Sequence, residues 1–161
     1  MDHQSRLALR SWPSHFTESD AIRLEPHAES FIMTDHLLVI GYGDTGRHAV
    51  NSVLSSQPDA QLTVLDSNFL SVAEAVANGA LAVHGDGRDR CALDEAAVDL
   101  ADRVIVAVPD DLNAYLITRA VRSLNPDTVI VAVIREPSNH ALFASDGTMS
   151  VHIRQADDEQ A

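Results

Sequence analysis

Runs of consecutive apolar residues alternate along this chain with segments in which apolar residues recur at helical spacing. From residue 36 onward, the runs predict short strands and the spaced segments predict the helices between them. Runs as apolar as residues 37–40 are typical of parallel strands that are buried on both faces. The predicted strands cover residues 37–40, 61–65, 81–83, 104–108, 129–134 and 150–153.

The segments between these strands carry the start and stop signals of helices. Gly79 stands where a helix C-terminal cap is needed, and either Asp110 or Asp111 is suited to cap the helix that follows the fourth strand. The predicted helices lie near residues 45–57, 71–78, 91–96, 111–125 and 139–144.

Strands that alternate with helices predict an α/β fold, a Rossmann-like doubly wound parallel sheet of about six strands in a single domain. The expected strand order is 3-2-1-4-5-6, in which ligands bind at the carboxyl ends of the strands beside strand 1. This domain is predicted to cover residues 36–154. Residues 1–35 are predicted to be an N-terminal linker or flexible segment, and residues 155–161 an acidic tail.

A glycine-spaced loop follows the first predicted strand, with the sequence Gly41-Tyr42-Gly43-Asp44-Thr45-Gly46. Gly41 permits a tight turn, Gly43 lets a pyrophosphate approach the backbone, and Gly46 lets the next helix pack closely on the strand. A phosphate there would contact free N–H groups at the positive end of the helix dipole. The loop therefore indicates a dinucleotide-binding turn, and the alternative is a structural turn without a ligand.

Asp66 ends the second predicted strand, twenty residues after Gly46. A carboxylate at this spacing accepts hydrogen bonds from an adenosine ribose. It would repel a 2′-phosphate, so NAD or an adenine nucleotide is expected rather than NADP. The alternative role for Asp66 is to cap the turn that follows it.

The net charge of the 161-residue chain is −13, from 24 acidic and 11 basic residues. All eleven basic residues are arginine, which excludes a Walker-type lysine, a Schiff-base lysine and a lysine general base. The acidic balance argues against nonspecific nucleic-acid binding, which requires a basic surface. The length fits about one domain.

The sequence offers no pattern typical of a membrane span, a metal site or a catalytic group. No apolar run approaches the roughly 20 residues that cross a bilayer, and residues 1–10 lack a signal-peptide pattern, so the expected location is the cytoplasm. The eight histidines are scattered and Cys91 is the only cysteine, so no metal ligands are assigned. Without a nucleophile elbow or a Cys-His pairing, no catalytic residue is assigned either.

Residues 36 to about 153 resemble the TrkA-N domain, also called the RCK N-terminal or KTN domain, a nucleotide-binding module of potassium transport and channel regulators. The resemblance rests on the glycine loop, on Leu65-Asp66, and on the segments VHGDGR (83–88), ADRVIVA (101–107) and PDDLN (109–113). The Gly-Asp step and the Asp-Asp-x-Asn helix start are its specific part, because ordinary dehydrogenases share only the first glycine loop.

The resemblance implies that NAD(H) or an adenine nucleotide (ATP, ADP or AMP) lies over the glycine loop with its ribose on Asp66. A turn role is the alternative for Asp86 and Arg88, and a capping role is the alternative for Asn113. The implied ligand-binding residues are Gly41, Tyr42, Gly43, Asp44, Thr45, Gly46, Asp66, Ser67, Asp86, Gly87, Val108, Pro109 and Asp110.

The sequence departs from the family pattern in three respects. Asp44 brings a negative charge into the loop, where it must point to solvent or weaken diphosphate binding, and Arg47 is placed to compensate. Many relatives carry an arginine on the fifth strand where this chain has Val133, and Arg135 could substitute only if the strand end bends inward. The family also usually continues beyond the sixth strand with a helix and often a second lobe that mediate assembly.

The function that the resemblance implies is regulatory. Ligand binding would shift the population of two domain or dimer arrangements and thereby control a potassium channel or transporter at the inner face of the cell membrane. A homodimer or higher homo-oligomer is expected, with partner contacts from helix residues such as Leu112, Leu116 and 141–143. The alternatives are a small NAD-dependent oxidoreductase, or a fragment of one, and a scaffold that pairs with homologues without binding a ligand.

Overall fold

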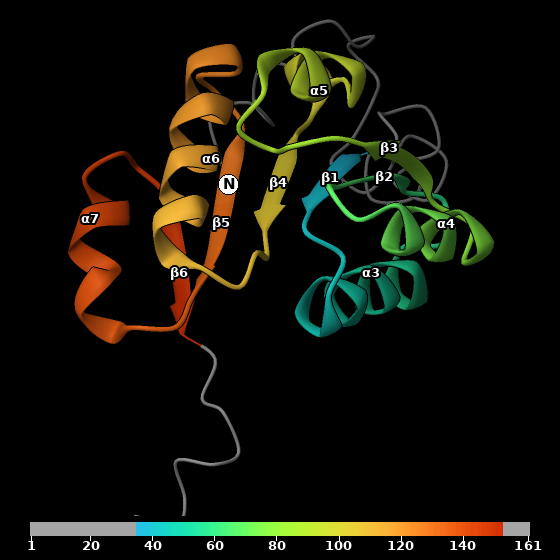
Figure 1. Ribbon diagram of the computed structural model, residues 1–161, viewed down its shortest axis with the longest axis horizontal. Helices are drawn as coiled ribbons and strands as arrows, with labels where there is room; N and C mark the ends of the chain where they lie inside the picture. The colour runs from blue at the N-terminus through green and yellow to red at the C-terminus, as the bar shows by residue number, and fades with distance from the viewer. Residues whose placement is uncertain (1–34, 153–161) are drawn as a thin grey trace, which may run out of the picture. The chain divides into compact units, whose positions relative to one another are not determined.

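The computed structural model describes residues 35–152, which form one parallel sheet covered by helices (Figure 1). The strand order is β3-β2-β1-β4-β5-β6, with every neighbouring pair parallel, so the predicted doubly wound α/β fold and its strand order are confirmed. Residues 1–34 and 153–161 lie outside the described residues, so the predicted acidic tail 155–161 and all but residue 35 of the predicted N-terminal segment 1–35 are not described. The strands are β1 (His36–Ile40), β2 (Gln61–Asp66), β3 (Leu81–His84), β4 (Arg103–Val106), β5 (Val129–Ile134) and β6 (Met149–His152).

Helices connect consecutive strands and cover both faces of the sheet, as can be followed in Figure 1. Within residues 35–152, none of the helices has the length and apolarity that a membrane span requires. The α-helices are α3 (Asp44–Ser56), α4 (Phe69–Ala77), α5 (Arg90–Glu95), α6 (Asp111–Leu124) and α7 (His140–Ala144), and the two short 3-10 helices are η3 (Val98–Leu100) and η4 (Pro137–Asn139).

Strand β1 is the centre of the molecule, because its alternate side chains enter two different cores. Leu37 and Val39 pack with residues of α3 and α4, whereas Leu38 and Ile40 pack with residues of α5, α6 and α7. Every residue of β1 is buried. This two-sided burial explains why the strand is a continuous apolar run rather than an alternating one.

Two element boundaries differ from the sequence-based prediction by two residues, and the others agree to within one residue. Helix α4 begins at Phe69 rather than at Ser71, because the Asn68 side chain accepts a hydrogen bond of 2.9 Å from the N–H of Leu70 and caps the helix earlier. Strand β4 ends at Val106, two residues before the predicted end. The two residues that follow pass close to the glycine loop instead of continuing the ladder.

The expectation that Phe143 contributes to an exposed apolar surface is wrong. Its side chain is fully buried in the core between the sheet and α6. The ring lies edge-on to Tyr115, with 5.8 Å between the ring centroids. Its neighbours Ala141 and Leu142 are exposed, as are Leu112 and Leu116 of α6.

The turn from β1 into α3 depends on two glycines that approach each other closely. Gly41 has a φ of +95°, which L side chains rarely adopt. A Cβ atom on Gly46 would lie 2.0 Å from the carbonyl oxygen of Gly41, whereas a Cβ atom on Gly43 would meet nothing within 4 Å. Because Gly46 has no side chain, the first turn of α3 can pack directly against the backbone that follows β1.

We expect Gly46→Ala to lower the free energy of unfolding by about 3 kcal/mol or more, because the added methyl group collides with backbone that cannot move aside cheaply. The matched variant Gly43→Ala, three residues earlier in the same turn and without a steric conflict, should lower it by about 1 kcal/mol or less. Urea denaturation of both variants measures the difference. Equal destabilisation by the two changes would contradict this account of the turn.

Candidate functional site

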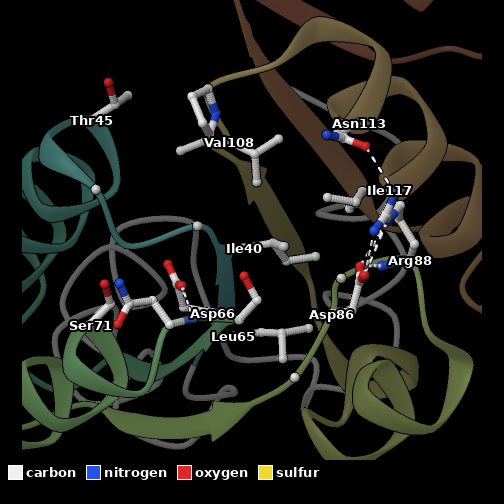
Figure 2. Close-up of a pocket in the computed structure, with 18 of the residues that line it drawn as sticks. Ile40, Thr45, Leu65, Asp66, Ser71, Asp86, Arg88, Val108, Asn113 and Ile117 are labelled. Atoms are coloured by element: carbon white, nitrogen blue, oxygen red, sulfur yellow. Dashed lines mark hydrogen bonds and ion pairs between the residues drawn. The ribbon is translucent and has the colours of Figure 1, made fainter.

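A crevice of about 500 Å³ lies at the carboxyl edge of the sheet, lined by the loops that follow β1, β2, β3 and β4 and by Arg135 after β5 (Figure 2). This is the edge where doubly wound sheets bind ligands, beside the strand at which the order reverses. Ten of the thirteen residues predicted from the sequence line the crevice: Gly41, Gly43, Asp44, Thr45, Asp66, Ser67, Asp86, Gly87, Val108 and Pro109.

The other three predicted residues do not line the crevice but hold elements that do. The Tyr42 side chain is buried in the core, where its hydroxyl accepts a hydrogen bond of 3.0 Å from the Asn78 amide. Gly46 lies against Gly41 within the turn. Asp110 caps α6 by accepting a hydrogen bond of 2.8 Å from the N–H of Asn113. Of the two predicted capping residues, Asp110 is thus the one that caps the helix.

The N-terminus of α3 opens into the crevice without a side-chain cap. Its N-cap residue is Gly43, and no hydrogen bond to another described residue involves the N–H groups of Asp44, Thr45 or Gly46. Helices α4, α5 and α6, by contrast, are each capped by an Asn or Asp side chain. Unpaired N–H groups at the positive end of a helix dipole are suited to hold an anion.

Asp66 joins the glycine loop to the turn that follows β2. One carboxylate oxygen accepts a hydrogen bond of 2.6 Å from the N–H of Tyr42, and the other accepts one of 2.7 Å from the N–H of Asn68. Asp66 therefore does stabilise the turn that follows β2, which was its alternative role. Each carboxylate oxygen accepts about two hydrogen bonds, so each can still accept one more. Asp66 also lines the crevice, so its remaining lone pairs are available to a hydroxyl group.

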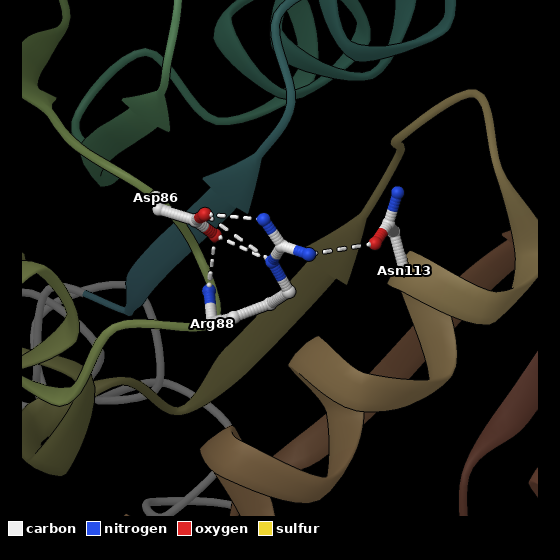
Figure 3. A network of polar contacts seen from close by, with 3 residues as sticks. All are labelled: Asp86, Arg88 and Asn113. Atoms are coloured by element: carbon white, nitrogen blue, oxygen red, sulfur yellow. Dashed lines mark hydrogen bonds and ion pairs between the residues drawn. The ribbon is translucent and has the colours of Figure 1, made fainter.

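A polar network made of Asp86, Arg88 and Asn113 forms the opposite wall (Figure 3). The Nη2 and Nε atoms of Arg88 lie 2.6 Å and 3.0 Å from the two carboxylate oxygens of Asp86, and its Nη1 atom donates to the Asn113 side chain at 3.2 Å. The network connects the β3–α5 loop to α6. In Figure 2 it faces Asp66 and Ser71 across the crevice, with Ile40 between them.

The negative charge that Asp44 brings to the loop points to solvent. Its side chain is 98% exposed, and Oδ1 lies 3.8 Å from Nη1 of Arg47. Nη2 of Arg47 also lies 3.1 Å from Oε2 of Glu74, and the guanidinium lies over the Tyr42 ring. Arg47 therefore compensates the charge of Asp44 only in part. High exposure weakens the repulsion between Asp44 and an anion at the end of α3.

Sequence reasoning did not assign several crevice residues to the site, among them Asn68, Ser71 and Ile117. Asn68 and Ser71 follow the Asp66 strand end closely, and Ile117 is four residues after Asn113 on the same helix face. Spacing from residues already identified would have found all three. Ile40 and Leu65 form an apolar floor at the strand ends. The sequence does not mark them as site residues, because both also belong to the hydrophobic core.

The Arg88 side chain and its N–H group hold the pKa of Asp86 below the ordinary value of 3.8. Because the folded-state pKa is lowered, the ion pair is present above the ordinary pKa and is lost as the pH falls through the lower, folded value. We expect Arg88→Gln to move the Asp86 titration midpoint upward, toward 3.8, in carboxyl-carbon NMR spectra. Arg90→Gln, which removes a guanidinium that pairs with Asp94 instead, is the control. An unchanged midpoint in Arg88→Gln would contradict the assignment.

Comparisons with known proteins identify the family and the fold of this chain. The family model of the TrkA-N domain matches residues 37–153. The inner membrane protein YbaL of Escherichia coli is 30% identical over 98 residues, which are 61% of this chain and 17% of YbaL. The chain spans about a fifth or less of the length of the curated relatives it matches.

Solved structures carry the same fold. The crystal structure of the TrkA-N domain of YbaL superposes with a TM-score of 0.68 at 25% identity, over 79% of this chain and 91% of that domain. The GsuK channel bound to NAD superposes with a TM-score of 0.65 at 23% identity, over 89% of this chain and 24% of the channel chain. The match to residues 37–153 of 161, together with this fold, shows that the chain belongs to the TrkA-N domain family.

Proposed function

We propose that this chain is a regulatory domain that binds NAD(H) or an adenine nucleotide and controls a potassium channel or transporter by a ligand-dependent conformational change. The observation that carries the proposal is the uncapped N-terminus of α3 beside Asp66, at the point where the strand order reverses. The N-terminus of α3 binds an anion, and Asp66 binds ribose hydroxyl groups.

The crevice supplies complementary groups for each part of an adenosine phosphate. Ribose hydroxyls donate to the free lone pairs of Asp66, and a phosphate accepts from the N–H groups of residues 44–46. Gly43 leaves open space where a phosphate must approach the backbone, since a Cβ atom there would meet nothing within 4 Å. The apolar floor of Ile40 and Leu65 lies beneath them.

The names of the relatives are consistent with nucleotide binding and with a membrane-protein partner. One structure with this fold is titled as the GsuK channel bound to NAD, and the YbaL domain belongs to an inner membrane protein. At 23% identity the GsuK structure supports the fold alone, so the nucleotide and the membrane partner rest on the crevice and on family membership taken together.

Helix α6 is the element through which the ligand acts on a partner. Asn113, in its first turn, lines the crevice and is bound to Arg88. Leu112 and Leu116 on the same helix are 64% and 43% exposed. A ligand that binds differently to two positions of α6 shifts the population between them, and the exposed leucines carry that shift to a second copy of the chain or to the membrane protein.

The binding proposal is tested by calorimetric titration with ADP and NADH of the wild-type chain and of two Asp→Asn variants. We expect Asp66→Asn to weaken binding by about tenfold or more, because charge-assisted hydrogen bonds to the ribose are lost. Asp89→Asn is the matched control, since Asp89 also accepts a hydrogen bond from the N–H two residues on but does not line the crevice. Equal affinities in the two variants would overturn the ribose assignment.

The proposed control of a potassium channel or transporter is tested in membrane vesicles from cells that produce this chain. Potassium flux is expected to respond to ADP or NADH with the wild-type chain and to lose the response with Asp66→Asn. If the isolated chain binds the nucleotide but the potassium flux does not change when the nucleotide is added, the proposed control of transport is contradicted. Stereospecific turnover of NADH by the purified chain would instead support the oxidoreductase alternative.

A further inference from the structure

We propose that Arg135 is a second phosphate contact of the crevice, acting together with the N-terminus of α3, and that Asp111 is the residue that positions it. The inference rests on the proposed function and specifies its ligand as an adenosine ligand with more than one phosphate. ADP and the diphosphate of a dinucleotide belong to this class.

Arg135 follows β5, yet it lines the same crevice as the glycine loop after β1. In the sheet, β4 separates these two strands, so their ends are about 10 Å apart at ordinary strand spacing. The crevice thus presents, in order, the Asp66 carboxylate at the end of β2, the α3 N-terminus after β1, the apolar residues 107–109 after β4 and a guanidinium after β5. A ligand that reaches all of these groups extends beyond adenosine and its first phosphate.

Three hydrogen bonds to Asp111 fix the backbone that carries Arg135. The N–H groups of Arg135 and Glu136 donate to the two carboxylate oxygens at 2.8 Å and 3.0 Å, and the Asn139 amide donates at 2.8 Å. Burial raises the pKa of Asp111, but these hydrogen bonds, together with the positive charge of the Arg135 side chain, outweigh it and the pKa lies below its ordinary value. The carboxylate therefore remains charged near neutral pH and keeps the end of β5 turned toward the crevice.

The charges that line the crevice leave Arg135 as the cation available to a ligand. The lining contains three aspartates (residues 44, 66 and 86) and two arginines (residues 88 and 135). Arg88 is already held by both carboxylate oxygens of Asp86. Arg135, by contrast, takes part in none of the ion pairs formed among residues 35–152. Its attraction to the Asp111 carboxylate acts at longer range than a contact ion pair, so an anionic ligand can bind this guanidinium without breaking a contact ion pair.

This arrangement also connects the ligand to α6. Asp111 is the first residue of α6 and holds the loop after β5. A phosphate that draws the Arg135 side chain inward therefore acts on a loop that is tied directly to the helix start. Asp111 is a positioning residue in this scheme and does not contact the ligand itself.

The test compares adenosine, AMP and ADP by calorimetric titration of the wild-type chain and of Arg135→Gln, Arg135→Lys and Asp111→Asn. In the wild-type chain we expect the affinity to rise with each phosphate. Arg135→Gln should lower the ADP affinity about tenfold and change the adenosine affinity less than about twofold, because one charge-assisted contact is lost. Arg135→Lys should recover part of the loss, and Asp111→Asn should reduce the ADP-to-adenosine ratio of affinities, which general loosening of the fold would leave unchanged.

Arg90→Gln is the matched control, because it makes the same change of net charge at an exposed arginine that does not line the crevice. If Arg135→Gln weakens ADP no more than Arg90→Gln does, the second phosphate contact is wrong while the proposed function stands. If the wild-type chain binds none of the three ligands, the proposed function fails and this inference fails with it.

Discussion

The contact between the first turn of α3 and Gly41, the residue that follows β1, is the constraint on which the site depends. Gly41 turns the chain with a positive φ, and Gly46 lets α3 touch the carbonyl oxygen of Gly41. Because α3 starts so close to the strand end, its N–H groups open at the edge of the sheet beside Asp66. A side chain at Gly46 would push α3 away from this turn, and one at Gly41 would collide with the backbone of Ala107 and strain the turn itself. Either change would disturb the placement of the anion-binding groups beside the acid.

The crevice has two walls that belong to the two cores of the molecule. The glycine loop and Asp66 belong to the wall beside α3 and α4, whereas the Asp86–Arg88–Asn113 network belongs to the wall beside α5 and α6. A ligand between them contacts both halves of the sheet at the line where the strand order reverses. Under the proposed function, a ligand that changes the separation of the walls would move α6 and its exposed leucines.

The fold and most of the crevice could be predicted from the sequence, because their signals are local. Continuous apolar runs report strands buried on both faces, and the glycine spacing and the acid at the end of β2 lie within a short stretch of chain. Contacts between distant segments could not be predicted. The Arg88–Asn113 hydrogen bond joins residues that are 25 positions apart, and the hydrogen bond from the N–H of Arg135 to Asp111 joins residues that are 24 apart. Neither contact produces a periodic pattern in the sequence. Burial of Phe143 depends likewise on how α7 packs on α6.

The central claim is that the free N–H groups at the start of α3 hold the phosphate of a nucleotide. It is tested most directly by backbone amide NMR spectra of the labelled chain recorded during titration with ADP. The account predicts the largest shifts at the amides of Asp44, Thr45 and Gly46, and small shifts at Leu70 and Cys91, whose N–H groups are already bound by capping side chains. Saturable binding that leaves the amides of residues 44–46 unmoved would contradict it.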